Sequence, residues 1–194
     1  MEHPICALST PLGSGGIAVI RVSGSGIFSL INPLFKSVDL TTSEPNRVYF
    51  GKFRDLHGTV IDEVLLTLFH GPKSYTGEDS IEISSHCNRL IVERILSALN
   101  TVGIRLAEAG EFTKRAFFNG KLDLTQAEAV ANLIHATNTY AVKNALNILD
   151  GKLSKIVEDM RQQMIKTAGL LEIDLDFSED DLDLVDLGVV KKYI

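Results

Sequence analysis

The 194-residue sequence lacks the features of a membrane protein, a secreted disulfide scaffold or a simple metal site. No run approaches the ~18 apolar residues of a membrane span. The N-terminus, MEHPICALST, has an acid and a proline where a signal peptide has a basic stretch and a long apolar run. The two cysteines, Cys6 and Cys87, have neither a paired nor a metal-ligand spacing. These absences predict a cytoplasmic protein without a membrane segment.

Motifs for binding phosphate or metal are also missing. No G-x-x-x-x-G-K-[ST] sequence occurs, so the chain by itself is not a P-loop nucleotidase. The segment STPLGSGG lies between two predicted strands, which favours a hairpin turn over a phosphate-binding loop. His86, Cys87 and His135 offer no second ligand pair, so structural roles are favoured and no metal site is predicted. The acidic run from Asp174 has Glu179 where an EF-hand loop needs glycine, which favours a solvated linker.

The distribution of charge divides the chain near Lys121. Residues 1–122 contain twelve Lys or Arg and twelve Asp or Glu, whereas residues 123–194 contain seven and thirteen. Neither part is a basic platform for nucleic acid, so a nucleic-acid partner would need its main electrostatic contact elsewhere. We therefore predict two domains, 1–122 and 123–194.

The first domain reads as short strands mixed with helices. Strands are predicted at 5–10, 17–23, 47–55, 59–69 and 81–85, and helices follow SGSG, with an interruption at Pro33, and span 88–102. Segments 47–55 and 59–69 flank the turn DLHG and should form a hairpin. This pattern predicts an α+β, or mixed α/β, domain.

The second domain reads as all-helical. Thr125 and Glu128 are spaced as a capping box, so a helix should begin near Thr125. One apolar stripe runs through 130–148 and ends at Gly151, and a second runs through 153–175. Two antiparallel helices of this length need more apolar surface than they give each other, so further helices or a partner should cover them.

Two charged residues interrupt apolar strands of the first domain. Arg21, in IAVIRVS, either lies at a sheet margin in water or points into a pocket for an anion. Glu82, in SIEIS, points to the opposite face of its strand from Ile81 and Ile83. It either belongs to a solvated strand face or recognises two parallel N–H donors, such as those of an amino-pyrimidine edge.

The junction GEFTKRAFFNGKLDLTQAEA combines cations, aromatic rings and glycines just before a predicted helix. Such a segment can fix the path of the chain between domains, and it can also place a cation such as Lys121 at a ligand. The remaining cations, Lys114 and Arg115, are predicted to pair with Glu108 and Glu111 at the surface.

Four motifs resemble one family in order and over essentially the whole chain. They are STPLGSGGIAVIRVSG, GPKSYTGEDSIEISSH, GEFTKRAFFNGKLDLTQAEAV and DLDFSEDD, and they resemble the bacterial tRNA-modification GTPases MnmE, also called TrmE. The junction motif is the most specific of the four. One departure is SSHCNR, which has Cys87 and Asn88 where the family usually has the glycines of HGG.

The resemblance implies a fold, ligands and partners. It implies an N-terminal domain similar to the folate-binding domain of aminomethyltransferases, followed by the first part of an all-α helical domain. Members of the family bind 5-formyl-tetrahydrofolate, form a homodimer through that domain, and act with MnmG on the wobble uridine of tRNA. The family's folate contacts fall on Arg21, Glu82 and Lys121. We expect Glu82 to meet the pterin, and the two cations to meet carbonyl, formyl or tail oxygens.

The resemblance also implies what this sequence does not carry. In the family a GTP-binding domain, which uses GTP, Mg²⁺ and K⁺, is inserted after the first helices. This sequence ends before that domain, with a third helical pattern begun at Val185, so we expect a piece of a longer enzyme and assign no catalytic residue. The alternatives are a dimerisation or partner-docking module with a vestigial pocket and, ranked last, a one-carbon transferase with activity of its own.

Overall fold

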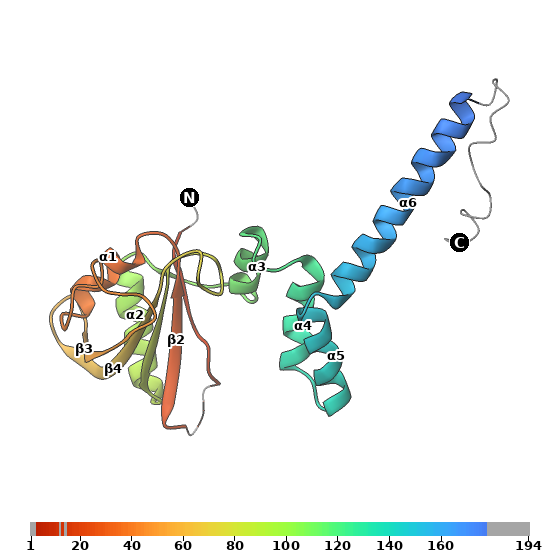
Figure 1. Ribbon diagram of the computed structural model, residues 1–194. Coiled ribbons are helices and arrows are strands. Elements are labelled where there is room, and N and C mark those ends of the chain that lie inside the picture. Colours follow the sequence, from red (N-terminus) through yellow and green to blue (C-terminus); the bar gives the residue numbers. More distant parts are fainter. Residues whose placement is uncertain (1–2, 12, 14, 178–194) are drawn as a thin grey trace. The chain divides into compact units, whose positions relative to one another are not determined.

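The computed structural model describes residues 3–11, 13 and 15–177 (Figure 1). Contacts within the chain divide it into two compact units, with the boundary between Leu122 and Asp123. The first unit combines a β-sheet with helices, and the described part of the second is helical. This arrangement confirms the predicted fold class, an α+β part followed by an all-α part.

The first unit contains a six-stranded sheet in the order β3-β4-β5-β2-β1-β6. Its strands are β1 (Ile5–Leu8), β2 (Ile17–Ser23), β3 (Val48–Arg54), β4 (Val60–Phe69), β5 (Ser80–His86) and β6 (Arg105–Leu106). All neighbouring strands are antiparallel except β1 and β6, which are parallel. The glycine-rich segment therefore connects two antiparallel strands, β1 and β2, as predicted, and the hairpin of β3 and β4 is confirmed.

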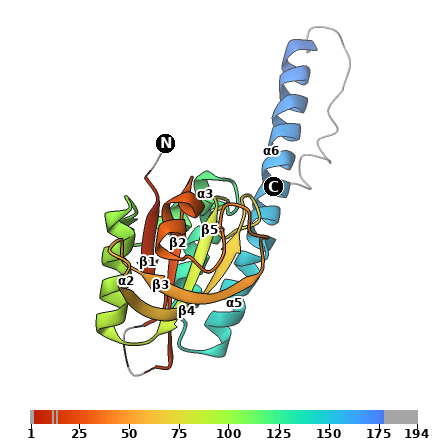
Figure 2. The same cartoon turned by 90° about the vertical axis from the view of Figure 1, so that its left-hand side faces the viewer.

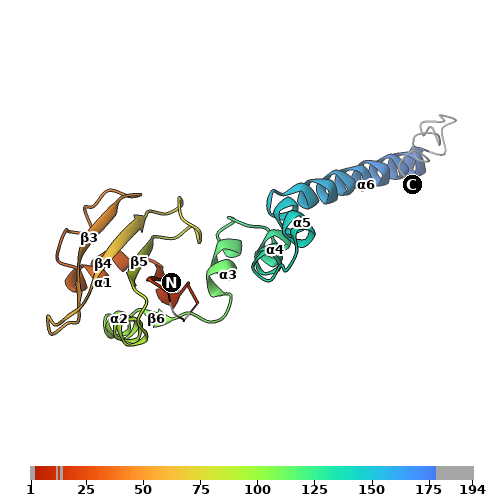
Figure 3. The same cartoon turned by 90° about the horizontal axis from the view of Figure 1, so that it is seen from below.

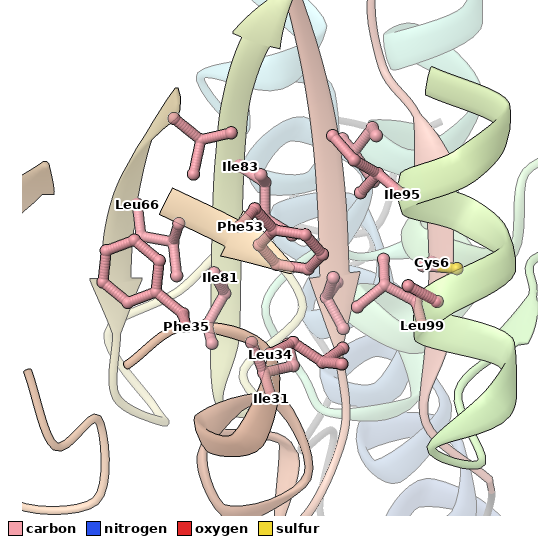
Figure 4. Close-up of a cluster of buried hydrophobic side chains, with 14 of the residues drawn as sticks. Cys6, Ile31, Leu34, Phe35, Phe53, Leu66, Ile81, Ile83, Ile95 and Leu99 are labelled. Carbon is pink, nitrogen blue, oxygen red and sulfur yellow. The ribbon is translucent and has the colours of Figure 1, made fainter. Parts of the chain in front are cut away.

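Helix α2 (Arg89–Thr101) lies along one face of the sheet (Figure 2). Side chains from α2 and from the strands interdigitate in the core, among them Ile95, Leu99, Ile83 and Phe53, each with 0 % of its surface exposed (Figure 4). Burying a side chain of this size stabilises the fold by about 1.5–3 kcal/mol. The core therefore fixes which face of each strand points inward.

Three shorter elements complete the first unit. They are α1 (Ile27–Ile31), the 3₁₀ helix η1 (Asn32–Leu34) and α3 (Glu111–Phe118). Pro33 lies in the first turn of η1, so the predicted interruption at Pro33 is confirmed as a change from α to 3₁₀ geometry.

The start of α2 accommodates the departure from the family motif. Asn88 has an extended backbone, with φ −119°, and its side chain accepts a hydrogen bond from the Leu90 backbone N–H, so it is the N-cap of α2. Among the described residues, Asn46 is the one non-glycine residue with positive φ. Cys87 and Asn88 therefore adopt backbone conformations that do not require glycine.

The second unit begins with two helices rather than with the single long one that the sequence predicted. Helix α4 (Leu124–Ile134) has His135 as its C-cap, and α5 (Thr139–Leu149) begins after Asn138, whose side chain accepts a hydrogen bond from the Ala141 backbone N–H. The two helices pack side by side (Figure 3). The prediction of one helix through 130–148 is wrong, because the helical spacing of apolar residues continues across the break between α4 and α5.

The capping box of α4 also differs from the predicted one. Asp123 and Gln126 form it, since the Asp123 carboxylate accepts from the Gln126 N–H and the Gln126 side chain accepts from the Asp123 N–H. The predicted pair of Thr125 and Glu128 is wrong. The Thr125 hydroxyl instead donates to Asp123 at 2.7 Å. The predicted helix start near Thr125 is confirmed, since α4 begins at Leu124.

Helix α6 (Lys152–Phe177) is the longest element, and it confirms the helical stripe predicted from residue 153. It includes Asp174 and Asp176, so the predicted acidic linker is wrong for these two positions, while Glu179 and the pattern from Val185 lie outside the described residues. Within the described part of the chain, no helix is both long and apolar enough to span a membrane.

Candidate functional site

Arg21 and Glu82 face each other on the sheet surface opposite the core. They are directly paired residues of β2 and β5, and the Arg21 Nε and Nη2 both donate to Glu82 Oε1, at 3.0 and 2.7 Å. The two side chains are 29 % and 30 % exposed, so the pair lies at the surface of the sheet without being fully solvated. Because Ile20, Val22, Ile81 and Ile83 occupy the core face, strand alternation places Arg21 and Glu82 on the other face.

Tyr75 adds an aromatic ring to this pair. It lies in the loop between β4 and β5, and the Arg21 guanidinium carbon is 5.2 Å from the centre of its ring, a cation–π distance. The Tyr75 hydroxyl hydrogen-bonds the Thr113 hydroxyl of α3 at 2.9 Å. The ring is therefore held over Arg21 by an element that is remote in sequence.

Lys121 follows α3 and contacts the same loop, but at a different residue. Its ammonium donates to the Pro72 carbonyl at 3.0 Å, and within the described residues it makes no hydrogen bond to Arg21 or Glu82. Gly77 of the loop lies against Lys121, because a Cβ added at Gly77 would be 3.2 Å from the Lys121 Cγ. The structure thus brings Arg21 and Glu82 together and places Lys121 against the loop that carries Tyr75.

A buried ion-pair network attaches this loop to α3. The Arg115 side chain, 3 % exposed, donates through Nη1 to Glu78 at 3.1–3.2 Å and through Nη2 to Glu111 at 2.9 Å. Arg105 also donates to Glu111. The predicted pairing of Arg115 with Glu111 is confirmed, but its predicted place at the surface is wrong, because the loop covers it.

The Glu111 carboxylate is strongly stabilised in its ionised form. Hydrogen bonds from Arg105 are the largest cause, followed by those from the Glu108 backbone N–H and from Arg115, and together they lower the Glu111 pKa from 4.5 to about 2. Arg115 Nη2 donates as well to the His3 carbonyl at 2.8 Å. The charged Arg115 side chain therefore links the N-terminal segment to α3 by a hydrogen bond.

Hydroxyl groups extend the network toward β2. The Ser23 hydroxyl donates to Glu78 Oε2 at 2.8 Å and lies 2.6 Å from the Thr76 hydroxyl, and both Ser23 and Thr76 are fully buried. Asn119, just after α3, donates to the Thr76 carbonyl at 2.7 Å. Since Ser23 is two residues from Arg21 on β2, the same contacts fix the loop relative to the Arg21–Glu82 pair.

Histidine and cysteine side chains play no part in this arrangement. His86 Nδ1 lies 2.8 Å from Asp62, and the Cys87 thiol donates to the Gly13 carbonyl at 3.4 Å. Burial raises the pKa of the Cys6 thiol to about 11, so the thiol stays protonated and unreactive. No group of three potential metal ligands occurs within the residues that the structure describes.

The acceptor oxygens of Glu82 suit a ligand with two parallel N–H groups. Glu82 Oε1 accepts both hydrogen bonds from Arg21, whereas Oε2 accepts none from the described residues. A carboxylate needs both oxygens for a bidentate contact with an amino-pyrimidine edge. The residues present therefore fit a pterin, provided that Arg21 releases Oε1.

The contribution of Tyr75 and of the buried network was missed from the sequence. Tyr75 stands in GPKSYTGED, directly before the strand of Glu82, and an aromatic residue in a glycine-rich loop beside a strand carboxylate was the available signal. The burial of Arg115 had a weaker signal. Its i, i+4 spacing to Glu111 is common on solvated helices, and only the position of Glu78 makes the pair a buried one.

Comparisons with known proteins cover both units. The family described as GTP-binding protein TrmE N-terminus matches residues 4–121, and the MnmE helical domain matches residues 124–194.

Individual relatives agree with these matches. A tRNA modification GTPase MnmE from Flavobacterium johnsoniae is 46 % identical over 188 residues, covering 95 % of this chain and 40 % of the relative. Proteins of the same name from Chlorobium chlorochromatii and Aquifex aeolicus are 43 % and 44 % identical, each over 94 % of this chain and over 39 % and 40 % of the relative. The chain thus spans about two-fifths of the length of the curated relatives that it matches.

Proposed function

Since this chain belongs to the family of tRNA modification GTPases MnmE, we propose that it supplies the folate-binding part of such an enzyme, with 5-formyl-tetrahydrofolate as the ligand. The observation that carries the proposal is the Arg21–Glu82 pair, half-buried on the second face of the sheet and flanked by Tyr75. Residues 1–122 form the folate-binding and dimerisation domain in this proposal, and residues 123–194 form the first part of the helical domain.

Glu82 is the pterin-binding residue in this proposal. Its two oxygens match the amino group and the adjacent ring N–H of the pterin, which lie side by side on one edge. Arg21 and Lys121 are the cations for the carbonyl, formyl or glutamate oxygens of the ligand. Hydrogen bonds to charged groups contribute about 1.5–3 kcal/mol each, so three such residues supply about 4.5–9 kcal/mol, the range of a millimolar to micromolar site.

A homodimer is the second element of the proposal. The second face of the sheet exposes large apolar side chains, with Ile17, Val48 and Phe50 each 60–65 % exposed and Leu65 43 % exposed. Phe50 and Leu65 are directly paired on β3 and β4, so they form a contiguous apolar surface on the same face as Glu82. An exposed apolar surface of this kind is typical of a protein–protein interface.

The activity of the complete enzyme is proposed from the family. In that proposal the enzyme acts with MnmG and uses the one-carbon unit of the folate to modify the wobble uridine of tRNA. GTP hydrolysis, with Mg²⁺ and K⁺, is assigned to no residue of this chain, because its sequence contains no P-loop motif.

Calorimetric titration of the 194-residue chain with 5-formyl-tetrahydrofolate tests the folate site. Arg21→Ala, Glu82→Gln and Lys121→Met should each weaken binding about tenfold or more, since each removes a charge-assisted hydrogen bond. Glu63→Gln is the matched control, because Glu63 forms a similar cross-strand pair with Lys52 at 3.8 Å, away from Tyr75. Wild-type affinity in a folded Glu82→Gln variant would refute the assignment of Glu82.

A partner-docking module is the alternative, and α6 is the observation that favours it. This helix exposes apolar side chains along its described length, with Met164 67 % and Ile156 57 % exposed. If calorimetric titration with the folate shows no binding heat, while sedimentation shows that the chain still dimerises, the module is favoured. Turnover of folate by the chain alone would instead favour the third candidate, a one-carbon transferase.

A further inference from the structure

The Arg21 guanidinium is held by two different neighbours. The Glu82 carboxylate accepts two of its hydrogen bonds, and the Tyr75 ring lies 5.2 Å from its carbon. Glu82 is on the neighbouring strand, whereas the Tyr75 hydroxyl is bonded to Thr113 of α3 at 2.9 Å. The position of the Tyr75 ring therefore does not depend on the Arg21–Glu82 ion pair.

A ligand that takes both oxygens of Glu82 must compete with Arg21. Glu82 Oε1 already accepts the Nε and Nη2 hydrogen bonds, and a bidentate contact with an amino-pyrimidine needs that oxygen. Once Glu82 turns to the ligand, Arg21 loses its carboxylate partner while its side chain stays about two-thirds buried. A cation in that setting is stabilised by the face of an aromatic ring.

We propose that Tyr75 is the positioning residue that keeps Arg21 beside the ligand when Glu82 exchanges the Arg21 guanidinium for the amino-pyrimidine edge. This inference rests on the proposed folate site, and it adds a residue that acts on the ligand through Arg21. With its ring fixed by Thr113, Tyr75 keeps the guanidinium over the sheet, where Arg21 can donate to a carbonyl or formyl oxygen of the same ligand.

The exchange also gives the site a preference among ligands. A planar ligand with parallel N–H donors satisfies Glu82 and leaves Arg21 free to donate to its oxygen atoms. A ligand without those donors leaves the Arg21–Glu82 pair intact, so it gains neither contact. Tyr75 should therefore matter for the pterin end of the folate and not for its glutamate tail.

A double-mutant cycle tests this role by calorimetric titration with 5-formyl-tetrahydrofolate. Tyr75→Leu should weaken binding about threefold to thirtyfold, the range for a cation–π contact, and Tyr75→Phe, which keeps the ring but loses the hydroxyl bonded to Thr113, should weaken binding by no more than Tyr75→Leu does. In an Arg21→Met background Tyr75→Leu should cause no further loss, because its effect passes through Arg21. Tyr140→Leu, at an 84 % exposed tyrosine of α5, is the matched control.

Two results would overturn the inference while leaving the folate site intact. They are an undiminished effect of Tyr75→Leu in the Arg21→Met background, and wild-type affinity in Tyr75→Leu. Thermal unfolding of each variant shows whether a loss reflects the fold instead. Absence of binding by the wild-type chain would refute the proposed function itself, so the two failures are distinguishable.

Discussion

Arg115 of α3 and Glu78 of the loop between β4 and β5 form an ion pair, with Nη1 and Oε2 3.1 Å apart. Their side chains are 3 % and 22 % exposed, so the pair is largely shielded from water. The same loop carries Tyr75, and Lys121 follows α3 and donates to the loop at Pro72. The Arg115–Glu78 pair therefore connects the two segments that flank the proposed ligand.

Removing Arg115 should destabilise the first unit. Arg115→Met leaves the Glu78 and Glu111 carboxylates in a buried setting with one cation fewer, which costs about 3 kcal/mol of unfolding free energy. Urea unfolding measures the loss. Arg89→Met is the control, because the Arg89–Glu93 pair is 80 % and 54 % exposed and such pairs contribute less than about 1 kcal/mol. Equal stability of the two variants would contradict the importance of the buried network.

The stability of the chain should fall in acid through Glu111. Its pKa is lowered to about 2 in the folded protein, against 4.5 for an ordinary glutamate, so the unfolded chain binds a proton more readily. The stabilisation is fully present above pH 4.5 and is lost as the pH falls from 4.5 toward 2. Urea unfolding at several pH values should show this slope, and Glu111→Gln should be less stable at pH 7 and should show a shallower slope.

The break between α4 and α5 predicts a role for one side chain. Asn138→Ala removes the acceptor for the Ala141 backbone N–H and should cost about 1 kcal/mol of unfolding free energy. Asn138→Asp keeps a capping oxygen and should retain most of the stability. Thermal unfolding followed by circular dichroism measures both, and equal melting temperatures for Asn138→Ala and the wild type would show that the cap contributes nothing.

The same region shows where apolar spacing is insufficient. Ile134 and Ala141 are seven residues apart, which fits one continuous helix, yet four residues with capping geometry at Asn138 separate α4 from α5. A sequence pattern of period 3.6 does not record where the backbone changes direction. The local competition between Asn138 and the helical hydrogen bond decides the break, and asparagine favours the cap.

The candidate site was also only partly predictable from the sequence. Alternation along its strand was enough to predict that Glu82 points away from the face of Ile81 and Ile83, whereas for Arg21 it left a sheet margin and a pocket as alternatives. Their direct pairing depends on β2 lying beside β5, which is a contact over 61 residues. The position of Tyr75 depends on α3 through Thr113, and no local pattern specifies such a contact.

Gly77 offers a test of whether the loop positions Lys121. Its φ is +79°, and an added Cβ would lie 3.1 Å from the Asn119 Cβ and 3.2 Å from the Lys121 Cγ. Gly77→Ala should therefore lower stability by about 1 kcal/mol through the backbone and also displace the segment that carries Lys121. Calorimetry should show 5-formyl-tetrahydrofolate binding weakened by up to about tenfold, the effect of losing one charge-assisted hydrogen bond.

Gly58→Ala separates backbone strain from displacement of Lys121. Gly58 has a similar φ of +87°, but nothing lies within 4 Å of a Cβ added there. It should lose similar stability and keep wild-type folate affinity, because the turn between β3 and β4 touches neither Tyr75 nor Lys121 in any hydrogen bond of the described chain. If Gly77→Ala and Gly58→Ala bind the folate equally well, the loop does not position Lys121 for the ligand.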